Sequence, residues 1–366
     1  MPVQRRKGKK CRHLSCLAIA RERIPTIFLF CVAAVFLFEP TFFSLNDTKE
    51  YKPPERVESS VRKPKIDRNA GRDGFMVLGM HRSGTSMLTG LLYMAGGYTF
   101  GGVFHKGKSN VKGFFERFDV VGQNQKWMQK QQVSWNNNVL AFDWEQALSD
   151  KESGAVPFNG GKRALGFFND PENVPWLQKD PRMCIALKIW LKLLGDREPA
   201  IVFTYRHPLE VAMSLVKRSP GMGVTKALKL WIAYNMRAIQ NSRGLCIVKT
   251  SNVALLKDPM SELQRISDEL TNKCKVVAPP HRVKQEEVDQ FFDPNLQHQK
   301  ASDKEKEVLE THNDGACVVY GFESKEEKGT RQYNKEREAY LIAMRIYCDL
   351  ESGKAHEEDY PWPDIT

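Results

Sequence analysis

An eight-residue segment, residues 79–86, constrains the fold of this chain more than any other feature. Its sequence is GMHRSGTS; it follows the apolar run FMVL and precedes Met and Leu residues at helical spacing. A strand, a tight glycine-containing turn and a helix together build a phosphate cradle, because backbone N–H groups and the helix dipole point at one place. The segment therefore predicts an anion site, and an ordinary glycine turn is the alternative.

The segment differs from a nucleoside-triphosphate P-loop at one position. Gly79 and Gly84 have the Walker spacing and Ser86 fits, but Thr85 stands where the P-loop has Lys. The cation of this segment is Arg82 instead. In ATPases and GTPases the Lys reaches the β and γ phosphates, and the next hydroxyl residue holds Mg²⁺. The replacement of the Lys argues against an ATPase or a GTPase.

Apolar runs alternate with helical patterns along the rest of the chain. We expect buried strands at residues 200–205 and 245–248, helices at 185–194, 209–217 and 225–239, and a late amphipathic helix at 335–350 within a charged part, 275–366. Alternating strands and helices form a parallel sheet with helices on both faces. The predicted fold class is α/β, a P-loop-like three-layer fold with a central parallel sheet, preceded by an N-terminal membrane anchor.

The positive charge of the chain is concentrated at its N-terminus. The net charge is +11, and residues 1–23 contain eight Lys or Arg against one Glu, so +7 lies in this basic tail and +4 in the remainder. Most of the excess therefore belongs to one short segment. A nucleic-acid-binding surface is not needed to explain the charge, and we expect no nucleic-acid partner.

Residues 24–43 are predominantly apolar and follow the basic tail. A signal anchor that spans the membrane and a cleaved signal peptide are both compatible with this pattern. We favour the anchor, because bulky Phe residues occupy the place where a signal peptidase site needs small ones. The Lys and Arg residues before it predict a cytoplasmic N-terminus, with the rest of the chain across the membrane.

Residues 44–70 are polar and contain several Pro, as expected of a solvated stem between the anchor and a catalytic domain at 71–366. The stem includes a glycosylation sequon at Asn46, which has meaning on the lumenal side of a membrane. Five of the eight cysteines follow the stem, and none is part of a CxxC pattern. This spacing argues against a zinc site and leaves one or two disulfides open.

A second polar motif follows the apolar run at residues 200–205. Arg206 comes directly after the run, Pro208 suits the first turn of a helix, and Ser214 lies about two helical turns further on. Ligands of open α/β sheets bind at the carboxyl ends of the strands. Arg206 and Ser214 are therefore expected to form a second phosphate clamp beside the first. In the alternative, Arg206 pairs with a local carboxylate.

The two motifs, in this order, resemble those of the sulfotransferase superfamily, and the loop is similar to that of Golgi carbohydrate and protein-tyrosine sulfotransferases. In that family the first strand, loop and helix bind the 5′-phosphosulfate of 3′-phosphoadenosine-5′-phosphosulfate (PAPS), and an Arg followed eight residues later by Ser binds the 3′-phosphate. The resemblance covers about residues 74–260. It implies PAPS as co-substrate, no required metal, and the following donor contacts: Arg82, Ser83, Gly84, Thr85, Ser86, Arg206 and Ser214.

The same resemblance implies catalytic roles. Arg82 is expected to stabilise the leaving phosphate, and Lys179, in the segment KDPR, to lie near the transferring sulfuryl group. Glu116 is the leading candidate for the base that takes the acceptor proton, although it could instead pair with a neighbouring cation. His81 is its rival for the base, and the weaker candidates are Asp180 and His105.

These expectations combine into one functional interpretation. The chain resembles a single-pass type II sulfotransferase of the Golgi membrane, with a lumenal catalytic domain and a glycan hydroxyl or amine as acceptor. Tyrosine in a secreted protein or a small alcohol is the rival acceptor. A P-loop kinase or NTPase and an inactive lectin-like module are the alternatives from other classes. Three tryptophans between the motifs could line an acceptor pocket, but at their spacing we expect core residues: Trp127, Trp135 and Trp144.

Overall fold

The computed structural model describes residues 71–102, 112–149, 159–292, 308–313, 315–321 and 326–365. The expected basic tail, signal anchor, stem and Asn46 sequon lie outside the described residues, and so does His105. Within the described ranges, no helix has both the length and the apolar character needed to cross a membrane. The anchor at residues 24–43 stays a prediction from the sequence.

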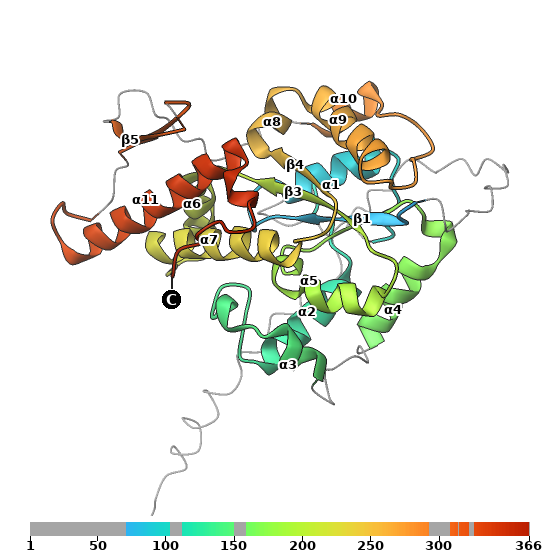
Figure 1. Cartoon of the computed structure of the whole chain (residues 1–366), viewed down its shortest axis with the longest axis horizontal. Helices are drawn as coiled ribbons and strands as arrows, with labels where there is room; N and C mark the ends of the chain where they lie inside the picture. Colours follow the sequence, from blue (N-terminus) through green and yellow to red (C-terminus); the bar gives the residue numbers. More distant parts are fainter. Residues whose placement is uncertain are drawn as a thin grey trace, which may run out of the picture. The chain divides into compact units, whose positions relative to one another are not determined.

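A four-stranded parallel sheet forms the centre of the described domain (Figure 1). Its strands, in spatial order, are β2 (Trp176–Lys179), β1 (Gly74–Leu78), β3 (Ala200–Tyr205) and β4 (Ile247–Ser251). The parallel sheet and the strand at 200–205 were predicted correctly. The strand expected at 245–248 begins at Ile247 and ends at Ser251, and β2 was not predicted at all.

Strand β2 escaped prediction because its second half is polar. Gln178 and Lys179 are both 0% exposed, in register with Met76 and Val77 of β1. Two adjacent polar residues usually predict an exposed segment, but here the neighbouring strand and helices bury them. Lys179 therefore lies at the buried end of a strand and not on a solvated surface turn.

Helices cover both faces of the sheet, as predicted. Side chains of β1 alternate between two apolar clusters, with Phe75 and Val77 in one and Met76 and Leu78 in the other. Figure 1 shows helices above and below the sheet. The helices above it are α1 (Thr85–Met94), α8 (Asn252–Lys257), α9 (Pro259–Asn272) and α10 (Gln285–Phe291).

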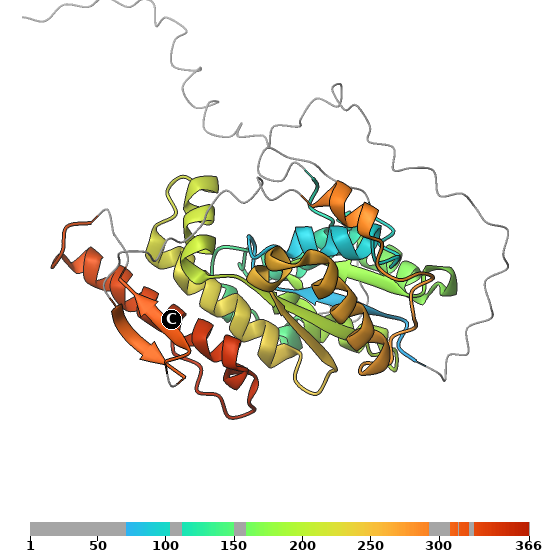
Figure 2. The ribbon, with the colours of Figure 1, turned by 90° about the horizontal axis from the view of Figure 1, so that it is seen from above.

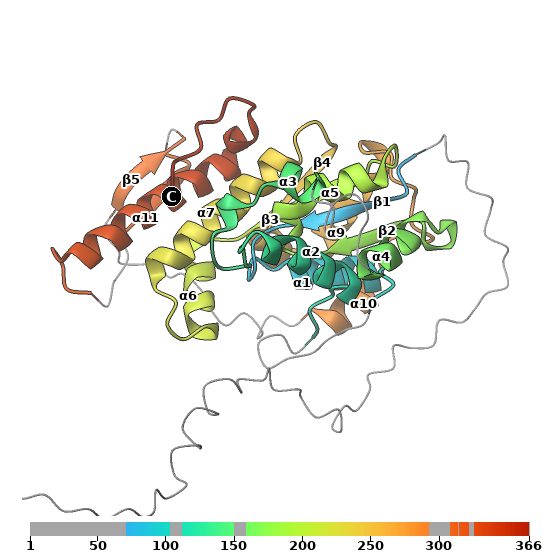
Figure 3. The ribbon, with the colours of Figure 1, turned by 90° about the horizontal axis from the view of Figure 1, so that it is seen from below.

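The second face carries more helices. The predicted helices at 185–194, 209–217, 225–239 and 335–350 are confirmed inside α5 (Met183–Leu194), α6 (Pro208–Arg218), α7 (Val224–Asn241) and α11 (Arg331–Ser352). Helix α7 packs against α5, α6 and α11, and Figures 2 and 3 show α7 beside α11. The other helical elements before β2 are α2 (Phe118–Lys130), η1 (Val139–Ala141), α3 (Trp144–Ser149), α4 (Asn159–Asn169) and η2 (Pro171–Asn173).

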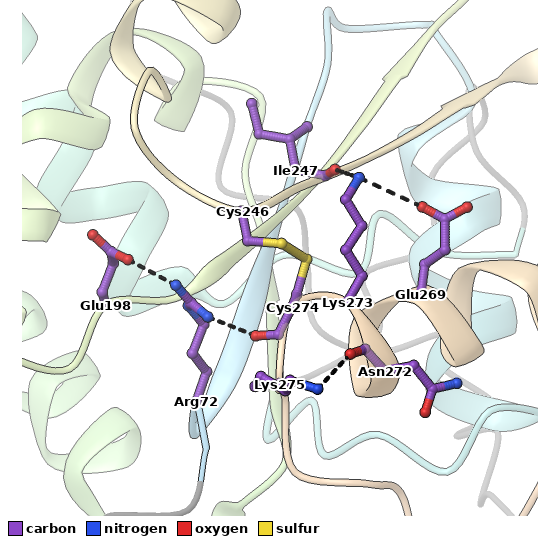
Figure 4. The surroundings of a disulfide bond; sticks show 9 residues. All are labelled: Arg72, Glu198, Cys246, Ile247, Glu269, Asn272, Lys273, Cys274 and Lys275. Atoms are coloured by element: carbon purple, nitrogen blue, oxygen red, sulfur yellow. Dashed lines mark hydrogen bonds and ion pairs between the residues drawn. A yellow bond between two sulfur atoms is a disulfide. The ribbon is translucent and has the colours of Figure 1, made fainter.

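Two disulfides tie the later part of the chain together. Cys246 before β4 is joined to Cys274 after α9, beside the side chain of Arg72 (Figure 4). Cys317 in β6 (Cys317–Tyr320) is joined to Cys348 in α11, which attaches the hairpin of β5 (Val308–His312) and β6. The short helix η4 (Lys354–His356) follows α11.

The order of the strands brings polar residues to one edge of the sheet. The chain leaves the carboxyl end of β1, pairs β2 on one side, and then places β3 on the other side. Such a switch point opens a crevice outside the carboxyl ends of the strands, where ligands bind in open α/β sheets. Both predicted phosphate motifs begin at this crevice, one after β1 and one after β3.

Candidate functional site

The loop between β1 and α1 has the backbone of an anion cradle. Arg82 and Gly84 have φ values of 71° and 84°, and the Ser83 N–H donates to the Met80 carbonyl over 3.1 Å. Gly84 is the N-cap of α1 and provides no side-chain cap for the N–H groups of the first turn. These N–H groups and the positive end of the helix dipole are therefore available to an anionic ligand.

Close packing explains both glycines of this loop. A Cβ at Gly79 would lie 2.4 Å from the Thr204 carbonyl oxygen of β3. A Cβ at Gly84 would lie 2.4 Å from Nδ2 of Asn252, the first residue of α8. The Gly79 N–H donates to the sulfur of Cys184, at 3.3 Å. The loop is thus held against β3, α5 and α8, and larger residues at the glycines would displace it.

The structure brings the two predicted phosphate motifs together. Arg82 Nε donates to Ser214 Oγ on α6 over 2.8 Å, and Arg206 reaches the backbone carbonyl of Arg82 over 3.4 Å. Arg206 also pairs with Glu210 over 2.6 Å, so the local carboxylate that the alternative interpretation required is present. Arg206 thus has a carboxylate partner and a position beside the loop at the same time.

Arg82 lies in a strongly positive environment. Burial lowers the pKa of its guanidinium, and the charges of Arg218 and Arg206 lower it further. Like charges that repel one another in this way are relieved by a bound anion. Ser83, in the same loop, is 0% exposed, and its Oγ has no hydrogen-bond partner among the residues that the structure describes. Both observations fit a phosphate or sulfate ligand at the loop.

Lys179 and Glu116 lie beside the first turn of α1. Lys179 Nζ donates to Glu116 Oε1 over 2.7 Å, to Ser86 Oγ over 3.2 Å, and to the carbonyl of Phe114. Ser86 is the second residue of α1, so the ammonium group lies beside the helix N-terminus. The structure therefore places Lys179, Glu116 and Ser86 together, while Thr85 is buried at the Walker Lys position.

Asp180 does not have the surroundings of a base. It is 0% exposed; one oxygen accepts from Asn124 over 2.8 Å and the other from Arg182 over 2.8 Å. Asn124 in turn accepts from the indole N–H of Trp190, over 2.7 Å. With both of its oxygens occupied, Asp180 orients Arg182, whose guanidinium lies 4.0 Å from Glu116.

His81 packs beneath the loop. It is 8% exposed and makes edge contacts with the rings of Trp135 and Tyr234. Burial lowers its pKa well below the ordinary value, followed in order by the charges of Arg182, Arg218, Lys179 and Arg82. His81 is therefore neutral at physiological pH. Its Nε2 is buried and has no hydrogen-bond partner among the described residues, so the choice between Glu116 and His81 as the base stays a prediction. Four cations acting on one buried ring again mark a positive site.

Sequence reasoning missed one cation of the site, Arg218, although it did name the tryptophan that Arg218 contacts. Arg218, the last residue of α6, lies over the ring of Trp135, with its Cζ 5.4 Å from the ring centre. Its spacing of four residues from Ser214 places both on one helix face, a signal that the sequence did contain. Trp127 is buried in the core and Trp135 and Trp144 pack partly buried against it, as expected.

No protein-family model matches the chain, and no curated protein matches it. The solved sulfotransferase domain from the curacin biosynthetic pathway is similar at 15% identity and a TM-score of 0.34, over 63% of this chain and 78% of that one. The sulfotransferase domain from the Synechococcus PCC 7002 olefin synthase is similar at 16% identity and a TM-score of 0.35, over 65% of this chain and 87% of that one.

Proposed function

We propose that this chain is a PAPS-dependent sulfotransferase that acts on a hydroxyl or amine of a glycan. The observation that carries the proposal is the 2.8 Å hydrogen bond from Arg82 to Ser214. It joins the loop after β1 to the motif after β3, so a single nucleotide with a 5′-phosphosulfate and a 3′-phosphate can contact both. A nucleoside triphosphate places its phosphates in one chain and has no group for Arg206 and Ser214.

The residues around the loop fit the chemistry of sulfuryl transfer. The acceptor oxygen attacks sulfur in line, the bond from sulfur to the 5′-phosphate oxygen breaks, and the bisphosphate leaves with the electron pair. Arg82, Lys179 and the N–H groups of α1 stabilise the charge that develops on this phosphate. The acceptor proton passes to Glu116, which its ion pair with Lys179 holds beside the reacting group.

The arrangement disfavours a kinase or NTPase. Thr85 occupies the position of the phosphate-binding Lys. Asp180, which follows β2, could have served as a magnesium carboxylate, but Asn124 and Arg182 occupy its oxygens. A P-loop enzyme needs both groups to hold the β and γ phosphates with their Mg²⁺.

The proposed setting is the Golgi lumen, with the chain anchored through residues 24–43 as a type II membrane protein. The basic tail before the apolar segment supports this orientation. The disulfides Cys246–Cys274 and Cys317–Cys348 support an oxidising compartment.

A transfer assay tests the proposed function. The purified full-length chain is incubated with ³⁵S-labelled PAPS and a panel of glycans, tyrosine peptides and small alcohols. We expect label on at least one glycan, and hydrolysis of ATP no faster than in the Arg82→Ala variant. Label on tyrosine peptides alone would show that the acceptor is a protein tyrosine and not a glycan. ATP turnover that depends on Arg82, with no transfer of label, would replace the sulfotransferase by an NTPase.

A further inference from the structure

Arg218 is an exposed cation at the edge of the candidate site. No carboxylate pairs with it among the described residues, in contrast to Arg182 and Arg206. Its guanidinium lies over the ring of Trp135, with Cζ 5.4 Å from the ring centre, and the side chain is exposed, so a ligand can reach it from solvent. Its charge also acts on Arg82 and His81, so it lies close to the loop.

The residues that directly follow Trp135 in the sequence line a groove. Its volume is about 940 Å³, and it lies between residues 136–141, the first half of α7, and α11. Three Lys and two acidic residues line it: Lys226, Lys229, Lys335, Glu338 and Asp364. The remaining polar lining is rich in side-chain amides, which both donate and accept hydrogen bonds as sugar hydroxyls do.

The wall of this groove is fixed to α7 at two points. The Tyr234 hydroxyl donates to the Trp135 carbonyl over 2.7 Å, and Arg237 donates to the Leu140 carbonyl. Tyr234 also contacts His81, beneath the loop. Tyr234 therefore links Trp135 to the loop, and Arg237 holds the segment 136–141 at the groove.

We propose that the acceptor is an anionic oligosaccharide, with a carboxylate or sulfate ester bound by Arg218 and the adjoining sugars in the groove. This inference rests on the proposed function. An Arg without a carboxylate partner favours a planar or tetrahedral oxyanion, which it binds through paired N–H donors. Three Lys and two acidic residues line the groove, so its net charge also favours an anionic ligand. Helices, two loops and the segment at Asp364 and Ile365 form its walls, and none of its lining residues belongs to a strand, so an extended peptide has no strand edge to pair with there.

Matched acceptors test the charge requirement with the full-length chain. Chondroitin and its carboxyl-reduced form test the carboxylate, and carrageenan oligosaccharides and their desulfated form test the sulfate ester. An acidic tyrosine peptide tests the rival class. We expect faster transfer to the charged member of at least one glycan pair than to its neutral partner or to the peptide.

The variant Arg218→Ala tests the residue. It should raise the KM for the preferred anionic glycan roughly ten- to hundredfold and leave the KM for its neutral partner unchanged. The Kd for PAPS should rise by much less than the KM for the anionic glycan, because the charge of Arg218 also acts on Arg82. Arg218→Lys should give an intermediate KM for the anionic glycan, because Lys keeps the positive charge but lacks the paired N–H donors of the guanidinium. Lys217→Ala, which removes an exposed cation from the same helical turn, is the control. It should change neither the KM for the anionic glycan nor the Kd for PAPS.

Three results would overturn the inference. Equal transfer to charged and neutral partners, or a preference for the peptide, would exclude an anionic glycan as the acceptor but would leave the proposed sulfotransferase activity unaffected. A Kd for PAPS that rises in Arg218→Ala as much as the KM for the anionic glycan assigns the residue to the donor. Failure of the wild-type chain to bind PAPS at all defeats the proposed function itself, and the inference with it.

Discussion

At the scale of single residues, Arg82 and Arg206 lie in contact, and the proposed function gives them different parts of the donor. Arg82 lies in the loop at the helix N-terminus, where the proposed reaction builds charge on the leaving phosphate, whereas Arg206 and Ser214 follow β3. Arg82→Ala should lower kcat about 10²- to 10³-fold, the usual effect of losing one oxyanion-stabilising donor. Arg206→Ala should chiefly raise the Kd for PAPS. Steady-state kinetics and calorimetry separate the two, and equal losses of affinity would contradict this division.

Glu116 gives the second prediction for a residue. Glu116→Gln keeps the shape of the side chain but removes the proton acceptor, so kcat should fall about 10²- to 10⁴-fold, with the Kd for PAPS nearly unchanged. Asp119→Asn is the matched control, because Asp119 also pairs with a cation, Arg117, but lies apart from the Lys179 contacts. A Glu116→Gln enzyme with wild-type kcat would exclude Glu116 as the base.

At the scale of elements, the loop between β1 and α1 depends on Gly84. In Gly84→Ala the new Cβ would meet Asn252 at 2.4 Å with φ at 84°, a conformation that Ala rarely adopts. We expect a loss of about 1–3 kcal/mol in unfolding free energy and weaker PAPS binding. Gly122→Ala in α2 meets no atom within 4 Å, and should stabilise the chain by about 0.5–1 kcal/mol. Denaturant unfolding of both variants measures the difference.

The elements differ in how far the sequence predicted them. Strands β1 and β3 are continuous apolar runs and were predicted, as were the helices with a clear apolar face. Strand β2 was missed, because the burial of Lys179 depends on Glu116, Ser86 and Phe114, which are far away in the chain. The contact of Arg218 with Trp135 joins α6 to a distant loop and has no local pattern.

At the scale of the whole molecule, the disulfides hold together segments on which the site depends. Cys246–Cys274 closes a separation of 28 residues and fixes β4 beside the end of α9. Replacing both cysteines by Ser should cost about 2–4 kcal/mol of unfolding free energy, and a reducing agent should lower the Tm of the wild type by more than that of this variant. Among the described residues, Cys184 is the cysteine outside the two disulfides; burial raises the pKa of its thiol to about 12, so it should stay unreactive in the folded chain. An equal Tm with and without reductant would contradict a structural role for both disulfides.

The central claim is that the loop after β1 and the motif after β3 together bind one nucleotide with 5′ and 3′ anionic groups. Calorimetric titration of the full-length chain tests it with adenosine 3′,5′-bisphosphate, adenosine 5′-monophosphate and ATP with Mg²⁺. We predict that the bisphosphate binds at least tenfold more tightly than either competitor, roughly the value of one charge-assisted contact, and that Arg206→Ala removes this preference. Tighter binding of ATP with Mg²⁺, or equal affinity for the mono- and bisphosphate, would contradict the account.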